Sequence, residues 1–300
     1  MSQTSPLGFV GLGVMGEPMC RNVAEKSGRT LLAFDRAAEP LARLVTHGVQ
    51  AAASVVALAA VCDTLFICLP SGAHVADVAT EAFTAGGCLR RIVDMGTSPV
   101  ALTRDLAARA AAVGITWTDA PIARTRQAAE DGTLSVMVGA TAADYAALLP
   151  LLGCMASDIT LCGPVGCGQA VKILNNMVLV ETVAALAEAM AIGRSVGLDA
   201  QVLLETLAKG SADSFALRNH GMKAMLPGVF PERAFSVEYA RKDISYALEL
   251  AQAGGTDAAG AERGATLLDA AKAAGWGAQY WPVIARVLAP LAVDNPAADA

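Results

Sequence analysis

The stretch from Leu7 to Val23 most constrains the fold of this chain, because an apolar run leads into the spacing G-x-G-x-x-G and then into a helix pattern. In such a strand–turn–helix, the first glycine permits a tight turn and the second lets a pyrophosphate approach the backbone. The third lets the helix pack closely on the strand. The free N–H groups at the start of the helix favour phosphates. The sequence therefore predicts a dinucleotide site formed by Gly11, Leu12, Gly13, Val14, Met15 and Gly16.

The choice between NAD and NADP depends on the residues that follow the second predicted strand, 30–34. Asp35 lies about 20 residues beyond the glycines, where a carboxylate accepts hydrogen bonds from a ribose diol and repels a 2′-phosphate. Arg36 comes next and can bind that phosphate or stack on the adenine. Asp35 is closer to the sugar along the chain, so the sequence favours NAD and leaves NADP open.

Helix and strand patterns alternate through the first half of the chain, which predicts a mostly parallel, doubly wound α/β sheet covered by helices. The predicted strands are 7–12, 30–34, 64–69, 91–95, 116–120, 134–139 and 158–161, and helices are predicted at 40–46, 54–60 and 102–113. Ligands of such sheets bind at the carboxyl ends of the strands. Leu69, Pro70 and Thr97 follow strands, so we expect their loops to line the nicotinamide end of the cofactor.

The second half of the chain contains no convincing strand pattern and predicts an all-helical domain. A helix pattern without proline runs from 170 to 196, which is long for a globular helix and indicates a helix joining two domains. Further helices are predicted at 200–208, 235–253, 258–274 and 282–288. We expect a Rossmann domain at 1–163, a helical substrate and oligomerisation domain at 164–296, and a tail at 297–300. The apolar helix faces exceed what one small domain buries, which predicts a homodimer or homotetramer.

Composition excludes several classes of function. The net charge of −6 argues against nucleic acid as a partner. No uninterrupted apolar run reaches the roughly 18 residues of a membrane span, and no signal-peptide pattern precedes the first strand. The 7 cysteines lack metal-type spacing and the 3 histidines are scattered, so we expect no metal site. These features are typical of a reduced, cytoplasmic protein that acts on a small molecule.

Lys172 and Asn176 are the clearest candidates for catalysis. They lie four residues apart, on one face of the predicted long helix. An apolar environment lowers the pKa of a lysine and makes it a usable general acid or base. The asparagine can hold a substrate hydroxyl or orient the amine. The competing interpretation is a lysine in the first turn of the helix that reaches water.

A second candidate stretch, 118–134, follows a predicted strand and so begins at the ligand-binding edge of the sheet. Arg124 offers a planar guanidinium suited to carboxylate, sulfonate or phosphate, and Thr125 adds a hydroxyl. The competing interpretation is a surface loop whose arginines pair with Glu130 or Asp131. For Arg126 we prefer that simpler interpretation.

Four motifs, in order along nearly the whole chain, resemble the β-hydroxyacid dehydrogenase family, which includes 3-hydroxyisobutyrate dehydrogenase and tartronate semialdehyde reductase. They are the segments 9–22, 119–134 and 168–176 and the pair Lys242-Asp243. The resemblance implies that Lys172 is the acid/base and that Asn176 belongs to the catalytic motif. It also implies that Lys242 lies near the active site, so we include it among both the substrate and the cofactor contacts. From its own position, Lys242 is either an exposed helix lysine or one that reaches the cleft between domains.

The chain departs from the family pattern at two places. The usual Asp-x-Ser-Thr reads Asp-Met-Gly-Thr at 94–97, and the usual Ser-Gly-Gly reads Ala-Arg-Thr at 123–125. The second change resembles the sulfolactaldehyde reductase branch, whose members also resemble succinic semialdehyde reductases. The resemblance implies that the substrate site contains Ala123, Arg124, Thr125 and Asn175, with Asn176 helping, and that the arginine and threonine bind the anionic end of the substrate.

The resulting hypothesis is an NAD-dependent oxidoreductase that interconverts a small anionic 3-hydroxyacid-type alcohol and its aldehyde. Specificity for 3-hydroxyisobutyrate or tartronate semialdehyde is an alternative. Imine reduction and a non-catalytic NAD-binding module are others, and Lys172 argues against both because relatives of those kinds tend to lack this lysine. Oxidative decarboxylation of the 6-phosphogluconate type is disfavoured by the short helical domain and the missing Ser-Gly-Gly.

Overall fold

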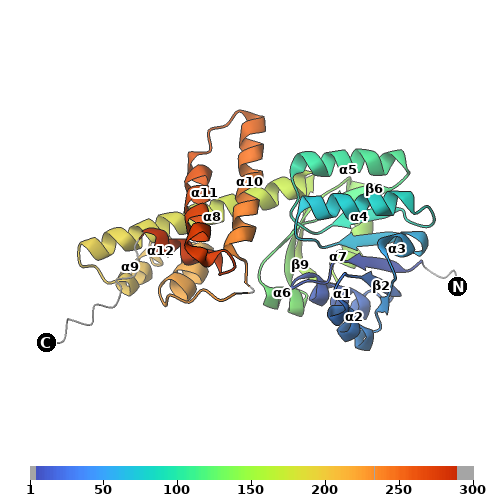
Figure 1. Cartoon of the computed structure of the whole chain (residues 1–300), viewed down its shortest axis with the longest axis horizontal. Helices are drawn as coiled ribbons and strands as arrows, with labels where there is room; N and C mark the ends of the chain where they lie inside the picture. The colour runs from blue at the N-terminus through green and yellow to red at the C-terminus, as the bar shows by residue number, and fades with distance from the viewer. Residues whose placement is uncertain (1–4, 233, 289–300) are drawn as a thin grey trace. The chain divides into compact units, whose positions relative to one another are not determined.

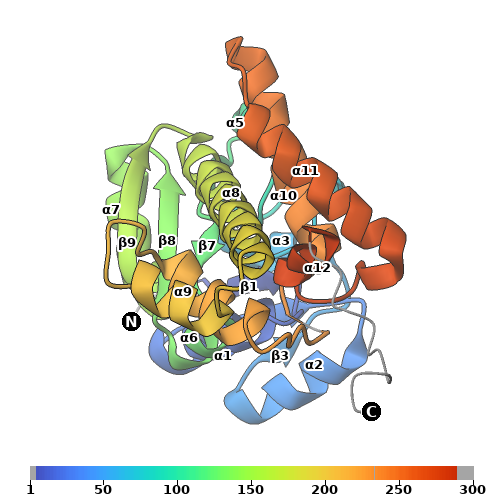
Figure 2. The same ribbon diagram turned by 90° about the vertical axis from the view of Figure 1, so that its left-hand side faces the viewer.

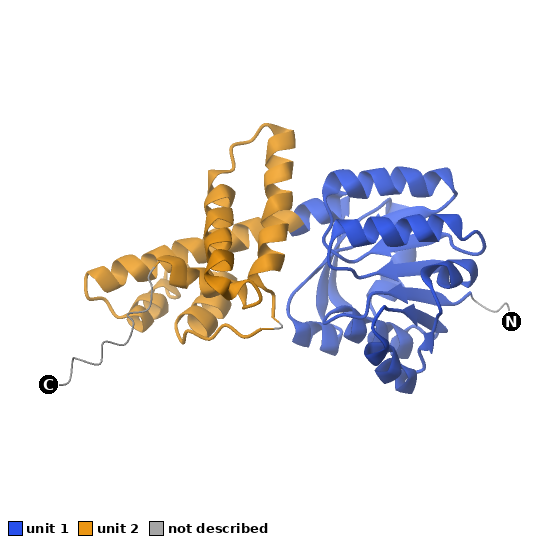
Figure 3. Ribbon diagram, viewed as in Figure 1, with its two compact units in different colours: residues 1–172 blue, residues 173–300 orange. Residues whose placement is uncertain are grey.

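The computed structural model describes residues 5–232 and 234–288, and the chain divides into two compact units, 1–172 and 173–300 (Figure 3). The division falls at Lys172, inside helix α8 (Cys167–Ser195), a few residues after the boundary predicted at 163. The start of α8 is hydrogen-bonded to the sheet of the first unit, and this explains the later boundary. Residues 289–296 of the predicted second domain and the predicted tail, 297–300, lie outside the described residues.

The first unit is a 9-stranded, mostly parallel sheet with helices packed on it (Figure 1), and it confirms the predicted doubly wound fold. Its strands are β1 (Leu7–Val10), β2 (Leu31–Phe34), β3 (Gln50–Ala51), β4 (Thr64–Ile67), β5 (Arg91–Asp94), β6 (Thr116–Asp119), β7 (Ile122–Ala123), β8 (Leu134–Gly139) and β9 (Ala156–Gly163). The strand order is β3-β2-β1-β4-β5-β6-β8-β7, and β9 pairs with β8 in parallel, side by side in Figure 2. Among the strands described, the antiparallel pairings are those of β8 with β6 and with β7.

Helices of the first unit cover both faces of this sheet and bury two apolar clusters. They are α1 (Gly16–Lys26), α2 (Ala38–Leu44), α3 (Val55–Val61), α4 (Gly72–Thr84), α5 (Val100–Ala112), α6 (Arg126–Asp131) and α7 (Ala142–Leu152). Strands β1 and β4 are buried along their whole length, which is why they read as continuous apolar runs. The sequence did not single out α4, because its buried face consists largely of small residues such as Ala79 and Ala82.

The second unit is helical in its described part, as predicted, and adds two isolated β-bridges. Besides most of α8, it contains α9 (Ala200–Leu207), a π-helix at Leu217–Met225, α10 (Val237–Gly254), α11 (Ala259–Ala271), a second π-helical turn at Lys272–Trp276, a 3-10 turn at Trp281–Ile284 and α12 (Ala285–Leu288). Trp281 is fully buried in the apolar cluster of this unit. The long helix predicted at 170–196 is observed at 167–195. The π-helix at 217–225 was not predicted.

Helix α8 is long and apolar enough to cross a membrane by length and composition alone, and core helices of soluble proteins can have the same length and composition. The side chains of Val183 and Ala187 on this helix are buried in the core of the second unit.

Candidate active site

The glycine loop has the shape that the sequence predicted. Gly11 has a φ of 92°, in the left-handed region, and a Cβ there would lie 2.2 Å from the carbonyl oxygen of Cys68. A Cβ on Gly16 would lie 1.9 Å from the carbonyl oxygen of Gly11. Gly13, by contrast, is exposed, and no heavy atom lies within 4 Å of its Cβ position. The loop therefore packs tightly on one side and leaves open space above Gly13, as a bound pyrophosphate requires.

The carboxylate of Asp35 lies against this loop. Its Oδ2 accepts a hydrogen bond from the backbone N–H of Leu12 at 2.5 Å, and its Oδ1 accepts one from Ala37 at 2.8 Å. Asp35 follows β2, which pairs with β1 in parallel register, so both strands end at the same edge. Arg36 is exposed beside it. This arrangement fits a ribose-binding carboxylate next to a pyrophosphate loop.

The loops after β4 and β5 also lie at this edge. A Cβ on Gly11 would lie 2.9 Å from Cδ2 of Leu69, and one on Gly96 would lie 2.9 Å from the carbonyl oxygen of Leu69. Strands β1, β4 and β5 are parallel neighbours, so their carboxyl ends meet here. The structure thus brings the predicted cofactor loops, including Pro70 and Thr97, to one edge of the sheet.

The start of α8 is anchored at the same edge by Asp119, the last residue of β6. This carboxylate accepts hydrogen bonds from the backbone N–H groups of Gly166 at 2.7 Å and Gln169 at 2.8 Å. Burial raises the pKa of Asp119, and these N–H groups act in the opposite direction. The family motif places Asp119 in a substrate-binding segment, but its side chain is fully buried and satisfies a helix N-terminus. Lys172 follows three residues after Gln169, in the first unit.

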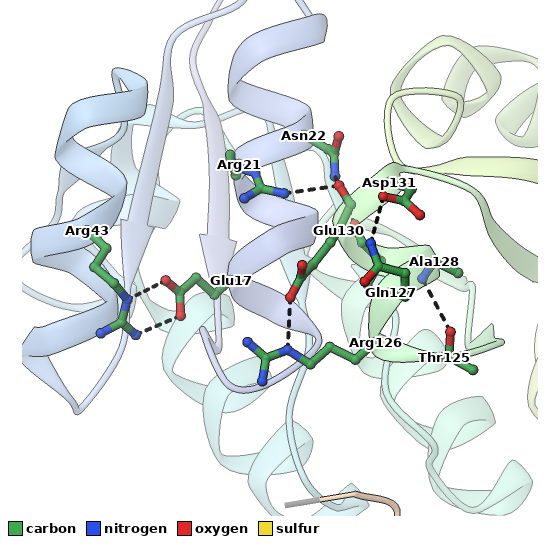
Figure 4. Close-up of polar contacts among 11 residues, drawn as sticks. Glu17, Arg21, Asn22, Arg43, Thr125, Arg126, Gln127, Ala128, Glu130 and Asp131 are labelled. Carbon is green, nitrogen blue, oxygen red and sulfur yellow. Dashed lines mark hydrogen bonds and ion pairs between the residues drawn. The ribbon is translucent and has the colours of Figure 1, made fainter. Parts of the chain in front are cut away.

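A further contact joins the cofactor helix α1 to the segment that carries the predicted substrate residues (Figure 4). The buried amide of Asn22 donates to the carbonyl oxygens of Pro18 and, in α6, of Ala129 at 2.9 Å. It also lies 3.3 Å from the carbonyl oxygen of Glu130, the contact drawn in Figure 4. Arg21 donates to the carbonyl oxygen of Glu130 at 3.0 Å. The resemblance to the family places Asn22 in the cofactor motif but assigns it no role. The structure shows that it holds α6 against α1.

Two charged pairs flank this contact. Arg126 donates to the Glu130 carboxylate at 2.9 Å, which is the simple pairing predicted for this arginine. Arg43 of α2 binds both carboxylate oxygens of Glu17 in the first turn of α1, at 2.6 and 2.7 Å. This hydrogen-bonded arginine lowers the pKa of Glu17. Both pairs are exposed to solvent and contribute little to stability.

Arg124 has an unusual backbone conformation, and both terminal nitrogens of its guanidinium are hydrogen-bonded. Its φ of 85° lies in the left-handed region, and it is the one non-glycine residue with positive φ among the described residues. Its guanidinium donates to the carbonyl oxygen of Thr133 at 2.6 Å, to Ser157 Oγ at 2.8 Å and to the Asp158 carboxylate at 2.5 Å. Arg124 thus pairs with these residues and not with Glu130 or Asp131, the partners that the simpler interpretation predicted for the arginines of this segment. The neighbouring Thr125 caps α6 by accepting the N–H of Ala128.

The remaining predicted residues lie in the second unit. Asn176 is buried, and its amide donates to Asp243 Oδ2 at 2.6 Å and accepts from Asn175 at 3.1 Å. Asp243 is also buried, and its Oδ1 lies 3.2 Å from the Lys242 ammonium. That ammonium lies over the rings of Tyr239 and Tyr246, with its nitrogen 5.6 and 5.4 Å from their centroids.

The Asp243 carboxylate thus fixes the amide orientation of Asn176 and connects the predicted catalytic motif to the predicted Lys-Asp pair. Ala123, in β7, pairs with Ser135 of β8. Sequence reasoning missed Gln169 as a connecting residue; the usable signal was an amide side chain three residues before Lys172 in a largely apolar helix pattern.

Comparison with known proteins identifies the family to which the chain belongs. Residues 6–163 match the model of the NAD-binding domain of 6-phosphogluconate dehydrogenase. Residues 166–288 match the model described as the NAD-binding domain of NADP-dependent 3-hydroxyisobutyrate dehydrogenase. Together the two models span most of the chain.

Individual relatives support the same assignment. The 2-(hydroxymethyl)glutarate dehydrogenase of Eubacterium barkeri is 36% identical over 260 residues, covering 85% of this chain and 85% of the relative. The 3-hydroxyisobutyrate dehydrogenase of Pseudomonas aeruginosa is 35% identical over 260 residues, covering 82% and 85%. The structure of the Mycobacterium tuberculosis 3-hydroxyisobutyrate dehydrogenase with L-serine matches with a TM-score of 0.87 at 28% identity, covering 95% of this chain and 99% of that one. The chain therefore belongs to the β-hydroxyacid dehydrogenase family and is an NAD(P)-dependent hydroxyacid oxidoreductase.

Proposed function

We propose that this enzyme interconverts a small anionic 3-hydroxyacid-type alcohol and its aldehyde, with NAD(H) as the preferred cofactor and Lys172 as general acid/base. One observation carries the proposal. The first unit places the open glycine loop, the Asp35 carboxylate and the anchored start of the Lys172 helix at the same edge of one parallel sheet. Sheets of this kind bind their ligands at that edge.

The residues of the glycine loop and Asp35 fit a dinucleotide, because the space above Gly13 is open and the carboxylate faces the loop. When bound, NAD(H) supplies or accepts the hydride. In reduction, the Lys172 ammonium donates a proton to the oxygen of the aldehyde. In oxidation, the neutral amine removes the hydroxyl proton. Asn176, four residues along the same helix, holds that oxygen, and Asp243 orients its amide.

The test of the proposed function is turnover with a panel of aldehydes, followed by the absorbance of NADH and, in parallel, NADPH. The panel contains succinic semialdehyde, sulfolactaldehyde, methylmalonate semialdehyde, tartronate semialdehyde and a neutral aldehyde of matching size. We expect a strong preference for one anionic aldehyde. Preference for methylmalonate or tartronate semialdehyde would replace the proposed branch by its alternatives, and NADH binding without turnover of any aldehyde would contradict the proposed reaction.

Cofactor preference gives a separate prediction. In Asp35→Ser, the carboxylate that repels a 2′-phosphate is absent while Arg36 remains. We expect the affinity for NADPH relative to that for NADH, given by the ratio of their dissociation constants, to rise by about tenfold or more. This corresponds to roughly the 1.4 kcal/mol of one charge-assisted contact. Fluorescence titration with both cofactors measures this ratio. Arg36→Ala is the matched control, and it should move the ratio the other way if Arg36 binds the phosphate. An unchanged ratio in Asp35→Ser would contradict the role of the carboxylate.

We further propose that Arg124 binds the anionic end of the substrate, exchanging Asp158 for it. Arg124→Ala should then raise the KM of anionic aldehydes by about 10- to 100-fold, the range of a lost charge-assisted hydrogen bond, and leave the KM of the neutral aldehyde nearly unchanged.

Asp158→Asn is the informative control, because it weakens the ion pair with the guanidinium while it leaves Arg124 in place. If Arg124 binds substrate, Asp158→Asn should lower or preserve the KM of anionic aldehydes. If the two variants impair anionic and neutral aldehydes alike, Arg124 only stabilises the turn between β7 and β8.

A further inference from the structure

Gln169 is a fully buried polar side chain in the first turn of α8 that the reaction described above does not use. Both ends of its amide are satisfied. Its Oε1 accepts the backbone N–H of Ser98 at 3.0 Å, and its Nε2 donates to the carbonyl oxygen of Gly96 at 2.9 Å. Only this orientation of the amide pairs both groups, since a flipped amide would face a donor with a donor. Gln169 therefore clamps the loop after β5 at both sides of Thr97.

The backbone of Gln169 is held as firmly as its side chain. Its N–H donates to Asp119 Oδ2 at 2.8 Å. At the preceding residue, Gly168, a Cβ would lie 2.4 Å from the carbonyl oxygen of Met137, so the helix can approach β8 this closely only with glycine there. The first turn of α8 is therefore fixed from two directions before the chain reaches Lys172.

The loop at 96–98 is also hydrogen-bonded to Asp94. Asp94, fully buried at the end of β5, accepts the backbone N–H of Gly96 at 3.0 Å and the hydroxyl of Ser98 at 2.9 Å. Its Oδ2 also lies 3.3 Å from Nε2 of Gln169. Buried networks in which every member is paired define a single geometry. The loop at 96–98 and the first turn of α8 thus belong to one hydrogen-bonded network.

We propose that Gln169 is a positioning residue, which fixes Lys172 relative to the loop at 96–98 that lines the nicotinamide end of the cofactor. This inference rests on the proposed function of Lys172. Residues three apart lie on neighbouring positions of a helix, so a shift of Gln169 displaces Lys172 with it. Hydride transfer and proton transfer occur at one carbon–oxygen bond, and small errors in the relative position of the two groups reduce the rate strongly.

The test uses Gln169→Met in the full-length enzyme, because methionine has a similar shape and neither hydrogen-bonding end. We expect kcat to fall by about 10- to 100-fold. The dissociation constant of NADH, measured by fluorescence titration, should change by less than about threefold, since the glycine loop and Asp35 are untouched. Gln169→Asn keeps the amide on a shorter side chain and should show a smaller loss of kcat with the same unchanged affinity. If Gln169→Met does not fold, Gln169→Asn alone decides the test.

Thr103→Val is the matched control. Thr103 is a fully buried residue of α5, and its hydroxyl donates to the carbonyl oxygen of Pro99 at 3.1 Å. Its loss should lower the melting temperature without lowering kcat, which separates positioning from general destabilisation.

Two results would overturn the inference: a wild-type kcat in a folded Gln169 variant, or a loss of NADH affinity as large as the loss of kcat. Lys172→Ala distinguishes a failure of the positioning role of Gln169 from a failure of the proposed function of Lys172. If Lys172→Ala turns over normally, the proposed function fails. If Lys172→Ala is inactive and Gln169→Met is normal, only the positioning role fails.

Discussion

Lys172→Ala should lose about 10²- to 10⁴-fold in kcat while it binds NADH as the wild type does. The variant removes the group that exchanges a proton with the substrate oxygen, so the loss is confined to the transition state. The glycine loop, Asp35 and the Asp119 anchor of α8 do not depend on the lysine side chain. Steady-state kinetics with saturating aldehyde, together with fluorescence titration of NADH, measures the two quantities separately.

Lys172→Arg distinguishes proton transfer from simple charge attraction. Arginine keeps the positive charge and does not give up its proton near neutral pH. If Lys172 is the acid/base, Lys172→Arg should be nearly as inactive as Lys172→Ala. If the lysine only attracts the anionic substrate, Lys172→Arg should retain most of the turnover. Lys209→Ala, which changes an exposed lysine just beyond α9, is the control and should behave as the wild type.

The parts of the structure that the sequence predicted well are those set by local rules. The glycine spacing, the apolar strands β1 and β4 and the long α8 each follow from residues close together along the chain. The alternation of helix and strand then leads to a parallel sheet, and the parallel sheet places the loops at one edge. Local patterns and this topology are therefore sufficient to predict that the glycine loop, Asp35 and the start of α8 lie at one edge of the sheet.

The parts that could not be predicted depend on contacts between distant residues. Asp119 reaches Gly166 across 47 residues of chain, and Asn22 reaches Ala129 across 107. Arg124 pairs with Asp158, 34 residues away, because β9 lies beside β8, a pairing that no local pattern encodes.

Gly13→Val should weaken NADH binding by about a hundredfold, or roughly 2.7 kcal/mol, without destabilising the fold. The Cβ of the new side chain would meet no heavy atom within 4 Å, and the φ of Gly13 is not positive, so we expect the free protein to accept a side chain here. The added methyl groups would occupy the space through which a pyrophosphate approaches the loop. Fluorescence titration gives the affinity, and thermal unfolding without cofactor gives the stability.

Gly16→Ala supplies the opposite case within the same loop. Its Cβ would lie 1.9 Å from the carbonyl oxygen of Gly11, so the loop must distort, and we expect a loss of about 1–3 kcal/mol in the free energy of unfolding of the cofactor-free protein. Comparison of the two variants separates a glycine required by the ligand from a glycine required by the fold. If Gly13→Val binds NADH normally, the cofactor does not pass over this loop. If Gly13→Val instead destabilises the free protein as Gly16→Ala does, its effect on NADH is a consequence of folding, and the assignment of the open space to the pyrophosphate is wrong.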